Sequence, residues 1–597
     1  MTTTSATYQY HPLQYPGQIR LLRLQPGDEL ASIQITIFPV LLGEKPIYEA
    51  LSYTWGDPNP RALISCNEDG DTIEITLNCE AALRRLRAKD KERILWIDAV
   101  CIDQSNIGER SRQVRLMSMI YQQAQRVLAY LGEASDDSDL GIDFILEDAA
   151  STFGSSGRPS VGLGPNNFSS PQQKAVDRIL ERPYFERIWI LQEILLAREV
   201  QVILGNKTVD WRAFSRTVYH VDKNKKLFLG PKYHGKPPKV VFYRDQSTKR
   251  PTLITDKPDS LLAFLKDTRH CKSSDPRDMV YALLGMSLEK DDFLPNYDLS
   301  TRDVFISLTK FFIKRDKKLD VLCHVQGARS PYNLPSWVPD WSYPRLSDVL
   351  GHEKTLSIRP YKAALDTNAN VNDRQDTEFL SQNPEILFQR PEILFQNPEI
   401  FFQNPERMMR CTVNSSQSQD ILVAEGIPVD TVSRIGPMYT IDDEMNTSSL
   451  QQWEDIAKTL PRDPTETDVS SAFIDTLIAY PAYRDPNPFA RFYPAWCTSI
   501  FSGQPPDASA AIFQEQLNKV CHGRCFFVTG KGYMGLGPPE MQKEDLVAVL
   551  LGGSVPFVLH AEEQEQFSLV GESYVHGLMN GEALEELETK RRMFHIK

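Results

Sequence analysis

The chain has few cysteines, no long apolar run and no leader-like start, and each absence excludes a class of protein. Its 597 residues include 9 cysteines, an odd number scattered from Cys66 to Cys525, so a disulfide framework is not expected. No stretch of about 18 apolar residues is present, so no membrane span is expected. The first residues lack the basic start and apolar stretch of a secretory signal. We therefore expect a soluble, cytoplasmic protein with reduced thiols.

Basic residues are outnumbered, and the common cofactor motifs are missing. The chain holds 66 Lys and Arg against 79 Asp and Glu, a net charge of −13, which provides no overall attraction to nucleic acid or to an anionic membrane. The phosphate-binding motif Gly-x4-Gly-Lys-Ser/Thr and the hydrolase motif Gly-x-Ser-x-Gly are absent. Cys521, His522 and Cys525 lack a second group of ligands nearby, so no metal site and no bound cofactor are expected.

The first part of the chain, to about residue 135, alternates between strand and helix patterns. Several strand runs are wholly apolar, as in strands buried on both faces of a parallel sheet. Apolar residues at three- and four-residue spacing mark helices between them, and Asn78 is expected to cap the first helix. We predict an α/β fold with a mostly parallel sheet flanked by helices. Its strands are expected at 19–24, 33–41, 50–55, 72–77, 94–98 and 127–131.

Shifts in composition divide the rest of the chain. A helical middle region is followed by a block of short strands, which predicts a small C-terminal β-rich unit. Residues 383–406 repeat a seven-residue unit, NPEILFQ, whose regular prolines exclude a coiled coil. We interpret this repeat as a duplicated linker insertion, with a partner-binding array as the alternative. The expected regions are N-terminal strands at 1–46, an α/β domain at 47–215 with a flexible insertion at 151–170, a basic mobile segment at 216–258, a helical region at 259–345, a linker at 346–420 and an α+β region at 421–597.

Three clusters of polar and aromatic residues are candidates for chemistry. Ser52–Asp57 and Trp96–Gln104 each follow a predicted strand. Arg187–Glu193 lies on a predicted helix, where Trp189 and Glu193, four residues apart, share a face. Because ligands bind at the carboxyl ends of parallel strands, the clusters predict a binding site. The alternative is structural: aromatic core packing, a carboxylate that caps a helix and a glutamate paired with an arginine.

In this order and spacing, the clusters resemble the fungal heterokaryon incompatibility (HET) domain. Its marks are an A-L-S-Y-x-W-G-like strand end, a W-I-D-x-x-C-I-D/N-Q segment and an R-x-W-x-x-Q-E helix, which Ala50–Gly56, Trp96–Gln104 and Arg187–Glu193 match. Asp275–Asp278 and Pro335–Trp341 also have the look of such proteins. The resemblance implies an intracellular protein of fungal non-self recognition and programmed cell death, comparable to innate immunity. Such a protein is expected to act together with protein partners or as a homo-oligomer.

The HET domain is in turn distantly similar to Toll/interleukin receptor domains, which have flavodoxin-like sheets and in some cases cleave NAD. By this analogy Glu193 is the expected catalytic residue, and NAD or a related nucleotide is a substrate rather than a cofactor. A carboxylate would stabilise the oxocarbenium ion that develops as nicotinamide leaves, or would attack it. Two functions stay open: such an enzyme, or a non-catalytic signalling scaffold. The residues expected to bind ligand are Tyr53, Trp55, Asp98, Asp103, Gln104, Arg187, Trp189 and Gln192.

Overall fold

The computed structural model divides into two compact units. Unit 1 comprises Met1–Thr301 with Trp341–Pro344, and unit 2 comprises Arg302–Asp340 with Arg345–Lys597. Most of the predicted insertion at 151–170 and all of the repeats at 383–406 lie outside the described residues. The structure describes residues 6–28, 31–67, 71–152, 170–229, 260–327, 330–345, 347–350, 363, 411–416, 419–441, 446–460, 464–465, 468–480, 487, 489–502, 508–586 and 588–597.

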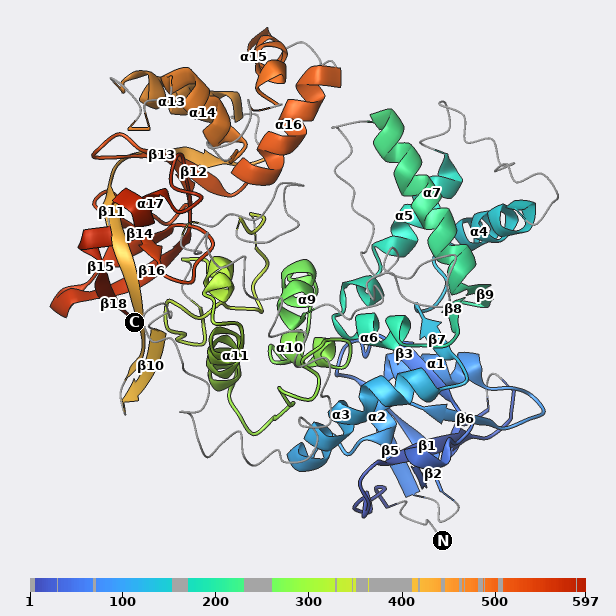
Figure 1. Ribbon diagram of the computed structural model, residues 1–597. Helices are drawn as coiled ribbons and strands as arrows, with labels where there is room; N and C mark the ends of the chain where they lie inside the picture. Colours follow the sequence, from blue (N-terminus) through green and yellow to red (C-terminus); the bar gives the residue numbers. More distant parts are fainter. Residues whose placement is uncertain are drawn as a thin grey trace, which may run out of the picture. The chain divides into compact units, whose positions relative to one another are not determined.

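Unit 1 is built on a 9-stranded sheet (Figure 1). In its centre β6, β3, β7 and β8 run parallel, whereas β1–β2, β1–β6, β4–β5 and β8–β9 pair antiparallel. The sheet is therefore mixed, which corrects the prediction of a mostly parallel sheet. The reason is that β1–β2, β4–β5 and β8–β9 are joined by connections too short for a parallel crossover. In sheet order the strands are β5 (Asp71–Thr76), β4 (Arg61–Cys66), β2 (Gln34–Leu41), β1 (Gln18–Leu24), β6 (Arg93–Trp96), β3 (Glu49–Tyr53), β7 (Val127–Tyr130), β8 (Val200–Leu204) and β9 (Lys207–Asp210).

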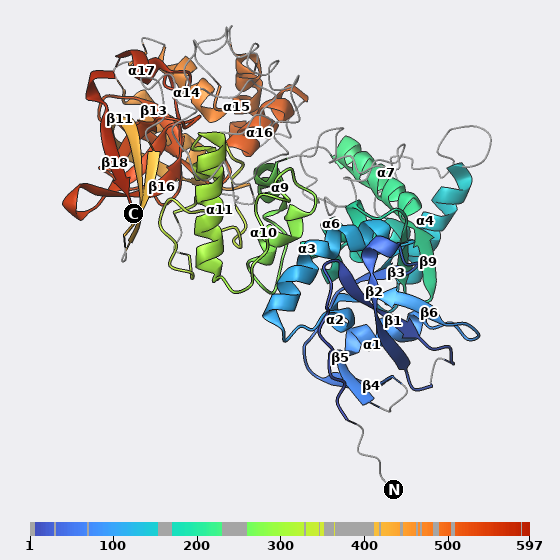
Figure 2. The ribbon, with the colours of Figure 1, turned by 60° about the horizontal axis from the view of Figure 1, so that its bottom comes forward.

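Helices cover both faces of this sheet (Figure 2). Successive side chains of a strand point to opposite faces, and on β3 Ser52 contacts Glu193 of α6 whereas Tyr53 lies beside Cys79 of α1. The helices α3 and α10 both pack against α6. The helices of unit 1 are α1 (Leu77–Leu86), α2 (Asp98–Cys101), α3 (Ile107–Gln123), α4 (Ser138–Thr152), α5 (Pro171–Leu180), α6 (Trp189–Leu195), α7 (Trp211–Leu229), α9 (Leu261–Thr268) and α10 (Asp278–Leu284).

The segment at 216–258, predicted to be basic and mobile, begins inside a helix. Helix α7 continues through Leu229. Residues 230–259 lie outside the described part of the chain.

Unit 2 contains a second sheet that closes on itself. The 21-residue strand β11 pairs with β18 and β14, and β14, β15, β16 and β18 complete the ring. Valines fill its interior, among them Val432, Val547 and Val558. The predicted C-terminal β-rich unit is thus confirmed. The strands are β10 (Cys411–Ser416), β11 (Gln419–Tyr439), β12 (Arg524–Thr529), β13 (Met534–Gly537), β14 (Leu546–Leu550), β15 (Phe557–Ala561), β16 (Gln566–Glu572), β17 (Tyr574–Val575) and β18 (Arg592–Ile596).

Helices also form the predicted middle of the chain and flank the closed sheet. Within the described part of the chain, no helix is both long and apolar enough to cross a bilayer. These helices are α11 (Thr301–Asp316), α13 (Asn446–Lys458), α14 (Val469–Leu477), α15 (Tyr493–Ser502), α16 (Ala508–Cys521) and α17 (Glu582–Glu586).

Candidate functional site

The three sequence clusters meet at the carboxyl ends of β3 and β6. The indole N–H of Trp55 donates to Asp98 Oδ2 at 2.9 Å, which joins the first cluster to the second. The guanidinium of Arg187 donates to the backbone carbonyl of Tyr53, which joins the third cluster to the first. Residues 43 and 134 positions apart along the chain are thus brought together.

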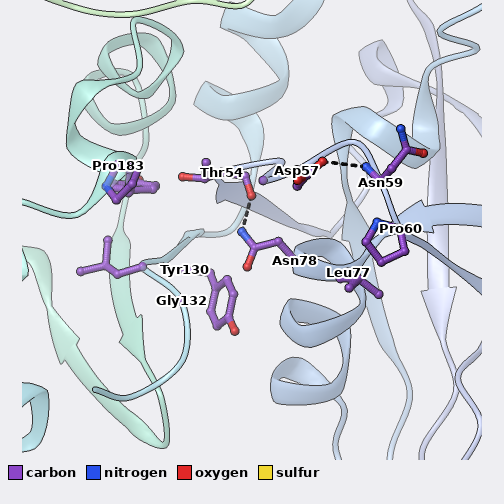
Figure 3. Close-up of a pocket in the computed structure, with 12 residues that line it drawn as sticks. Thr54, Asp57, Asn59, Pro60, Leu77, Asn78, Tyr130, Gly132 and Pro183 are labelled. Atoms are coloured by element: carbon purple, nitrogen blue, oxygen red, sulfur yellow. Dashed lines mark hydrogen bonds between the residues drawn. The ribbon is translucent and has the colours of Figure 1, made fainter. Parts of the chain in front are cut away.

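A cavity of about 440 Å³, here called the loop cavity, lies between the ends of β3 and β7 (Figure 3). Thr76, rather than the predicted Asn78, caps α1 by accepting from the N–H of Cys79. The side-chain amide of Asn78 instead donates to the carbonyl of Thr54, which holds the loop after β3 against α1. The cavity has the size of a small-molecule pocket. Its lining includes Thr54, Gly56, Asp57, Asn78, Tyr130, Gly132, Pro183 and Tyr184.

A second cavity of about 600 Å³, here called the indole cavity, adjoins the first, and the two share Thr54, Gly56 and Pro183. The side-chain amide of Gln104, on its wall, donates to the backbone carbonyl of Asp98 at 2.9 Å. Five of the predicted site residues line this cavity: Trp55, Asp98, Gln104, Arg187 and Trp189.

The other predicted ligand-binding residues line neither cavity. Tyr53 is buried, and its hydroxyl faces Cys79 on the α1 side of the sheet. Asp103 accepts from the N–H of Ser105 at 3.1 Å and from its hydroxyl at 2.6 Å, which forms the turn before α3. Gln192 is buried in α6.

Glu193, the predicted catalytic residue, is 2% exposed and lines neither cavity. The hydroxyl of Ser52 donates to its carboxylate and lies 2.6 Å from the hydroxyl of Tyr184. Tyr184 lines the loop cavity and is linked to Glu193 through Ser52, whereas Arg187 lines the indole cavity and acts on Glu193 through its charge. Burial raises the pKa of Glu193 to about 7, while the charge of Arg187 and the bond from Ser52 act in the opposite direction.

Asp98 is the predicted carboxylate that reaches a cavity. Strand β6 ends at Trp96 and Asp98 begins the short helix α2, so its side chain leaves the sheet at the edge. Burial raises the pKa of Asp98, and Arg187, the indole N–H of Trp55 and the N–H of Ala99 at 2.8 Å partly offset this effect.

A second carboxylate on the indole cavity, Asp278, was not among the site residues predicted from the sequence. Trp189 donates to its Oδ2 at 3.0 Å and Tyr297 donates to its Oδ1 at 2.5 Å. Burial raises the pKa of Asp278 to about 6. Arg110 also lines the cavity, with its guanidinium carbon 3.7 Å from the centre of the Tyr297 ring. The motif at Asp275–Asp278 was the available signal, but no local pattern shows where that motif docks.

The indole cavity therefore combines two indoles with charges of both signs. Indoles stack on flat rings, and guanidinium groups pair with phosphate oxygens. Among the described residues, no group of three or more His, Cys, Asp or Glu side chains is arranged to hold a metal ion. The acidic residues that line the cavity are Asp98, Glu186, Asp275 and Asp278, and the basic residues are Arg110, Arg187 and Lys272.

Known protein families match the same regions. The family model described as heterokaryon incompatibility protein (HET) matches residues 48–193. The chain contains a HET domain. A second family model, the Het-6 beta-barrel domain, matches residues 506–596, which hold most strands of the closed sheet. The match to the HET domain ends at Glu193, so Asp278 and Tyr297 lie beyond it.

Two curated proteins are related to this HET-domain chain. It is 24% identical to Heterokaryon incompatibility protein 6, OR allele, of Neurospora crassa, over 96% of this chain and 95% of the relative. It is 28% identical to Vegetative incompatibility protein HET-E-1 of Podospora anserina, over 19% of this chain and 9% of that protein. No solved structure matches the chain.

Proposed function

We propose that this chain is a fungal heterokaryon incompatibility protein that acts in non-self recognition and programmed cell death. The HET domain and the names of the two relatives support this proposal. The similarity to the Neurospora protein covers nearly all of both chains, so it extends to the barrel as well as to the HET domain. In this role the chain acts inside the cell with protein partners or with copies of itself.

The proposed activity of the HET domain is to bind and cleave NAD or a related nucleotide. The observation that carries this proposal is the indole cavity, where Trp55 and Trp189 offer flat faces to a ring and Arg110 and Arg187 offer positive charge to a pyrophosphate. The cavity lies at the carboxyl ends of parallel strands, where open α/β sheets bind ligands.

The topology of the sheet centre also supports a likeness to Toll/interleukin receptor domains. Along the chain the four parallel strands come in the order β3, β6, β7, β8, and in the sheet they stand as β6-β3-β7-β8. Their order is thus 2-1-3-4, the beginning of the flavodoxin-like order. The loop cavity lies between β3 and β7, the point at which this strand order reverses.

The proposed reaction needs one carboxylate beside the ribose. The bond between C1′ and the nicotinamide nitrogen breaks, and its electron pair leaves with nicotinamide as a neutral ring. Water adds to the resulting oxocarbenium ion and yields a proton to the carboxylate, which releases ADP-ribose. Asp98 lines the cavity, so we assign this role to it. Glu193 then acts as a positioning residue, because its charge favours the ionised form of Arg187 and its carboxylate holds Ser52.

Nicotinamide release by the full chain tests these assignments. Wild-type protein should release nicotinamide from NAD, and Asp98→Asn should lower kcat by at least about 100-fold. Glu193→Gln should act mainly on KM, by about tenfold, because Arg187 loses its orienting charge. Asp90→Asn is the matched control, since Asp90 is exposed and precedes β6 at the opposite end of that strand from Asp98; it should behave as wild type.

Other results of this assay would contradict the assignments. A Glu193→Gln variant without activity, beside a fully active Asp98→Asn, would return the catalytic role to Glu193. A wild-type chain that releases no nicotinamide would favour a non-catalytic signalling scaffold that acts by self-assembly or partner recruitment. The names of the relatives, which state incompatibility and no reaction, favour that second proposal. It predicts that both variants still trigger incompatibility when strains fuse.

A further inference from the structure

The wall of the indole cavity carries two matched pairs of side chains. In each pair an indole N–H donates to an aspartate: Trp55 to Asp98 at 2.9 Å, and Trp189 to Asp278 at 3.0 Å. All four side chains line the cavity. The hydroxyl of Tyr297 adds a second donor to Asp278, at 2.5 Å. Each carboxylate is thereby held in place by neutral donors, and each indole is oriented by a carboxylate.

These two aspartates differ from the other acids of the cavity in having no counter-ion at contact distance. Within the described residues, no Lys, Arg or His nitrogen lies within 4.0 Å of either carboxylate. By contrast, Asp275 pairs with Arg277 at 2.8 Å and with Arg110 at 3.0 Å. Burial raises the pKa of both Asp98 and Asp278, and the charges of Arg187 and Arg110, which lie beyond contact distance, offset only part of this effect. A cationic ligand would offset that cost.

Indole rings attract cations in a second way. A positive charge over the face of Trp is stabilised by the ring, more so than over Tyr or Phe. The cavity volume of about 600 Å³ admits one flat ring with its substituent. Two carboxylates and two indoles line the same cavity. Together they favour a ligand that is both positively charged and flat.

We propose that the indole cavity binds a planar organic cation, with Trp55 and Trp189 against the ring and with Asp98 and Asp278 offsetting its charge. The ligand class is an N-substituted pyridinium, of which the nicotinamide end of NAD is one example. The inference rests on the proposed function for the identity of that ligand, but its test requires no turnover.

The cation site is completed by a segment outside the matched HET region. Lys272 pairs along the backbone with the third cluster, donating its N–H to Glu186 at 2.6 Å and accepting from the N–H of Ile188 at 3.1 Å. The N–H of Tyr297 donates to Ser111 Oγ in α3 at 3.1 Å. These contacts dock residues 272–297 onto α3 and α6. A chain that stops before this segment would keep Trp55 and Asp98 and would lose the second pair.

Two small probes of the same shape test the proposal on the full chain. 1-Methylnicotinamide is a pyridinium cation, whereas nicotinamide is neutral. By calorimetric titration the cation should bind wild-type protein at least about tenfold more tightly than nicotinamide. Asp278→Asn should remove about a tenfold preference for the cation and leave nicotinamide binding unchanged. Asp298→Asn, the same change at an exposed residue directly after this segment, should retain the preference.

The outcomes separate this inference from the proposed function. Equal affinity for the two probes in wild-type protein would overturn the inference even if NAD is cleaved. Selective binding of the cation by a chain that releases no nicotinamide would uphold the inference and overturn the NAD-cleaving function. If Asp278→Asn kept the full preference for the cation, the inference of a cation site would be overturned as well. If that variant does not fold, Tyr297→Phe removes one donor to Asp278 while keeping the ring, and it should weaken binding of the cation only.

Discussion

At the residue scale, unit 1 concentrates acidic groups that are buried or partly buried. Asp98, Glu193 and Asp278 lie on different elements, and burial is the largest cause of the raised pKa of each. Such perturbed groups gather where chemistry or binding needs them, although structural networks also produce them. Here two of the three line one cavity, and the charge of the third favours the ionised form of Arg187 on its wall. This division of roles is the basis of the proposed mechanism.

Glu193→Gln should stabilise unit 1 increasingly as the pH rises. The folded-state pKa of Glu193 is about 7, above its ordinary 4.5, so the folded chain keeps a proton that the unfolded chain loses. The stability that this group contributes is complete below about pH 4.5 and is lost as the pH rises through 7. Because glutamine stays neutral, the variant avoids that loss. Its free energy of unfolding should exceed that of wild type by about 2–4 kcal/mol at pH 8 and by less at pH 5.

Thermal melts of both proteins at the two pH values measure this difference. The exposed Glu92→Gln variant is the control and should show no trend with pH. An equal Tm difference between Glu193→Gln and wild type at pH 5 and pH 8 would contradict a raised pKa at this position.

At the element scale, the close approach of three helices positions the second tryptophan–aspartate pair. An ideal Cβ on Gly285, which ends α10, would lie 2.6 Å from Ser118 Cβ in α3 and 3.2 Å from Gln192 Cδ in α6. Only a glycine permits that separation without a shift. Helix α10 begins at Asp278 and α6 begins at Trp189, so the helices that pack at this point also carry the second tryptophan–aspartate pair.

Gly285→Ala should therefore destabilise unit 1 by about 1–3 kcal/mol. A loss of stability would be informative, because helix propensity alone favours alanine over glycine by about 1 kcal/mol and predicts a gain. Gly108→Ala in α3 is the matched control, because its Cβ would lie 3.5 Å from the nearest side-chain atom, an ordinary contact. That variant should be neutral or slightly more stable. Chemical denaturation of the two variants compares them, and equal stabilisation in both would disprove the close packing of α10.

At the scale of the whole molecule, the chain passes between the two units several times. The motif at Pro335–Trp341 contains one such passage. Trp337 belongs to unit 2, where its indole N–H donates to the carbonyl of Asp420 at 3.2 Å. Trp341 belongs to unit 1, where the guanidinium of Arg269 lies 5.1 Å from its ring centre. Both rings are fully buried, so one short motif contributes a core residue to each unit.

Replacing these tryptophans should affect the two units separately. Trp341→Ala should destabilise unit 1, and Trp337→Ala should destabilise unit 2, each by about 3–5 kcal/mol. Hydrogen exchange resolves the effects, because β3 and β7 report on unit 1 and β14 and β15 report on unit 2. Each variant serves as the control for the other. Loss of protection in the same unit for both variants would show that the motif is not divided between the units.

Local patterns in the amino-acid order were enough to predict the alternation of strands and helices, the C-terminal β-rich unit and the three clusters. Such features depend on residues near in sequence, through hydrophobic period and turn chemistry. The clusters at Ser52–Asp57 and Trp96–Gln104 follow strands as predicted, and five of the predicted residues line one cavity. The HET-like motifs also marked the region that the family model matches.

Long-range packing decided the rest. Antiparallel neighbours on both sides of the parallel centre depend on which strands pair, and strand patterns alone do not show that. Glu193 faces β3 rather than the cavity, and its helix α6 is packed against both α3 and α10. Asp278 meets Trp189 across 89 positions of chain, a contact that no local period records. Side-chain direction and distant pairing are properties of the packed molecule, and they determine which carboxylates reach the ligand.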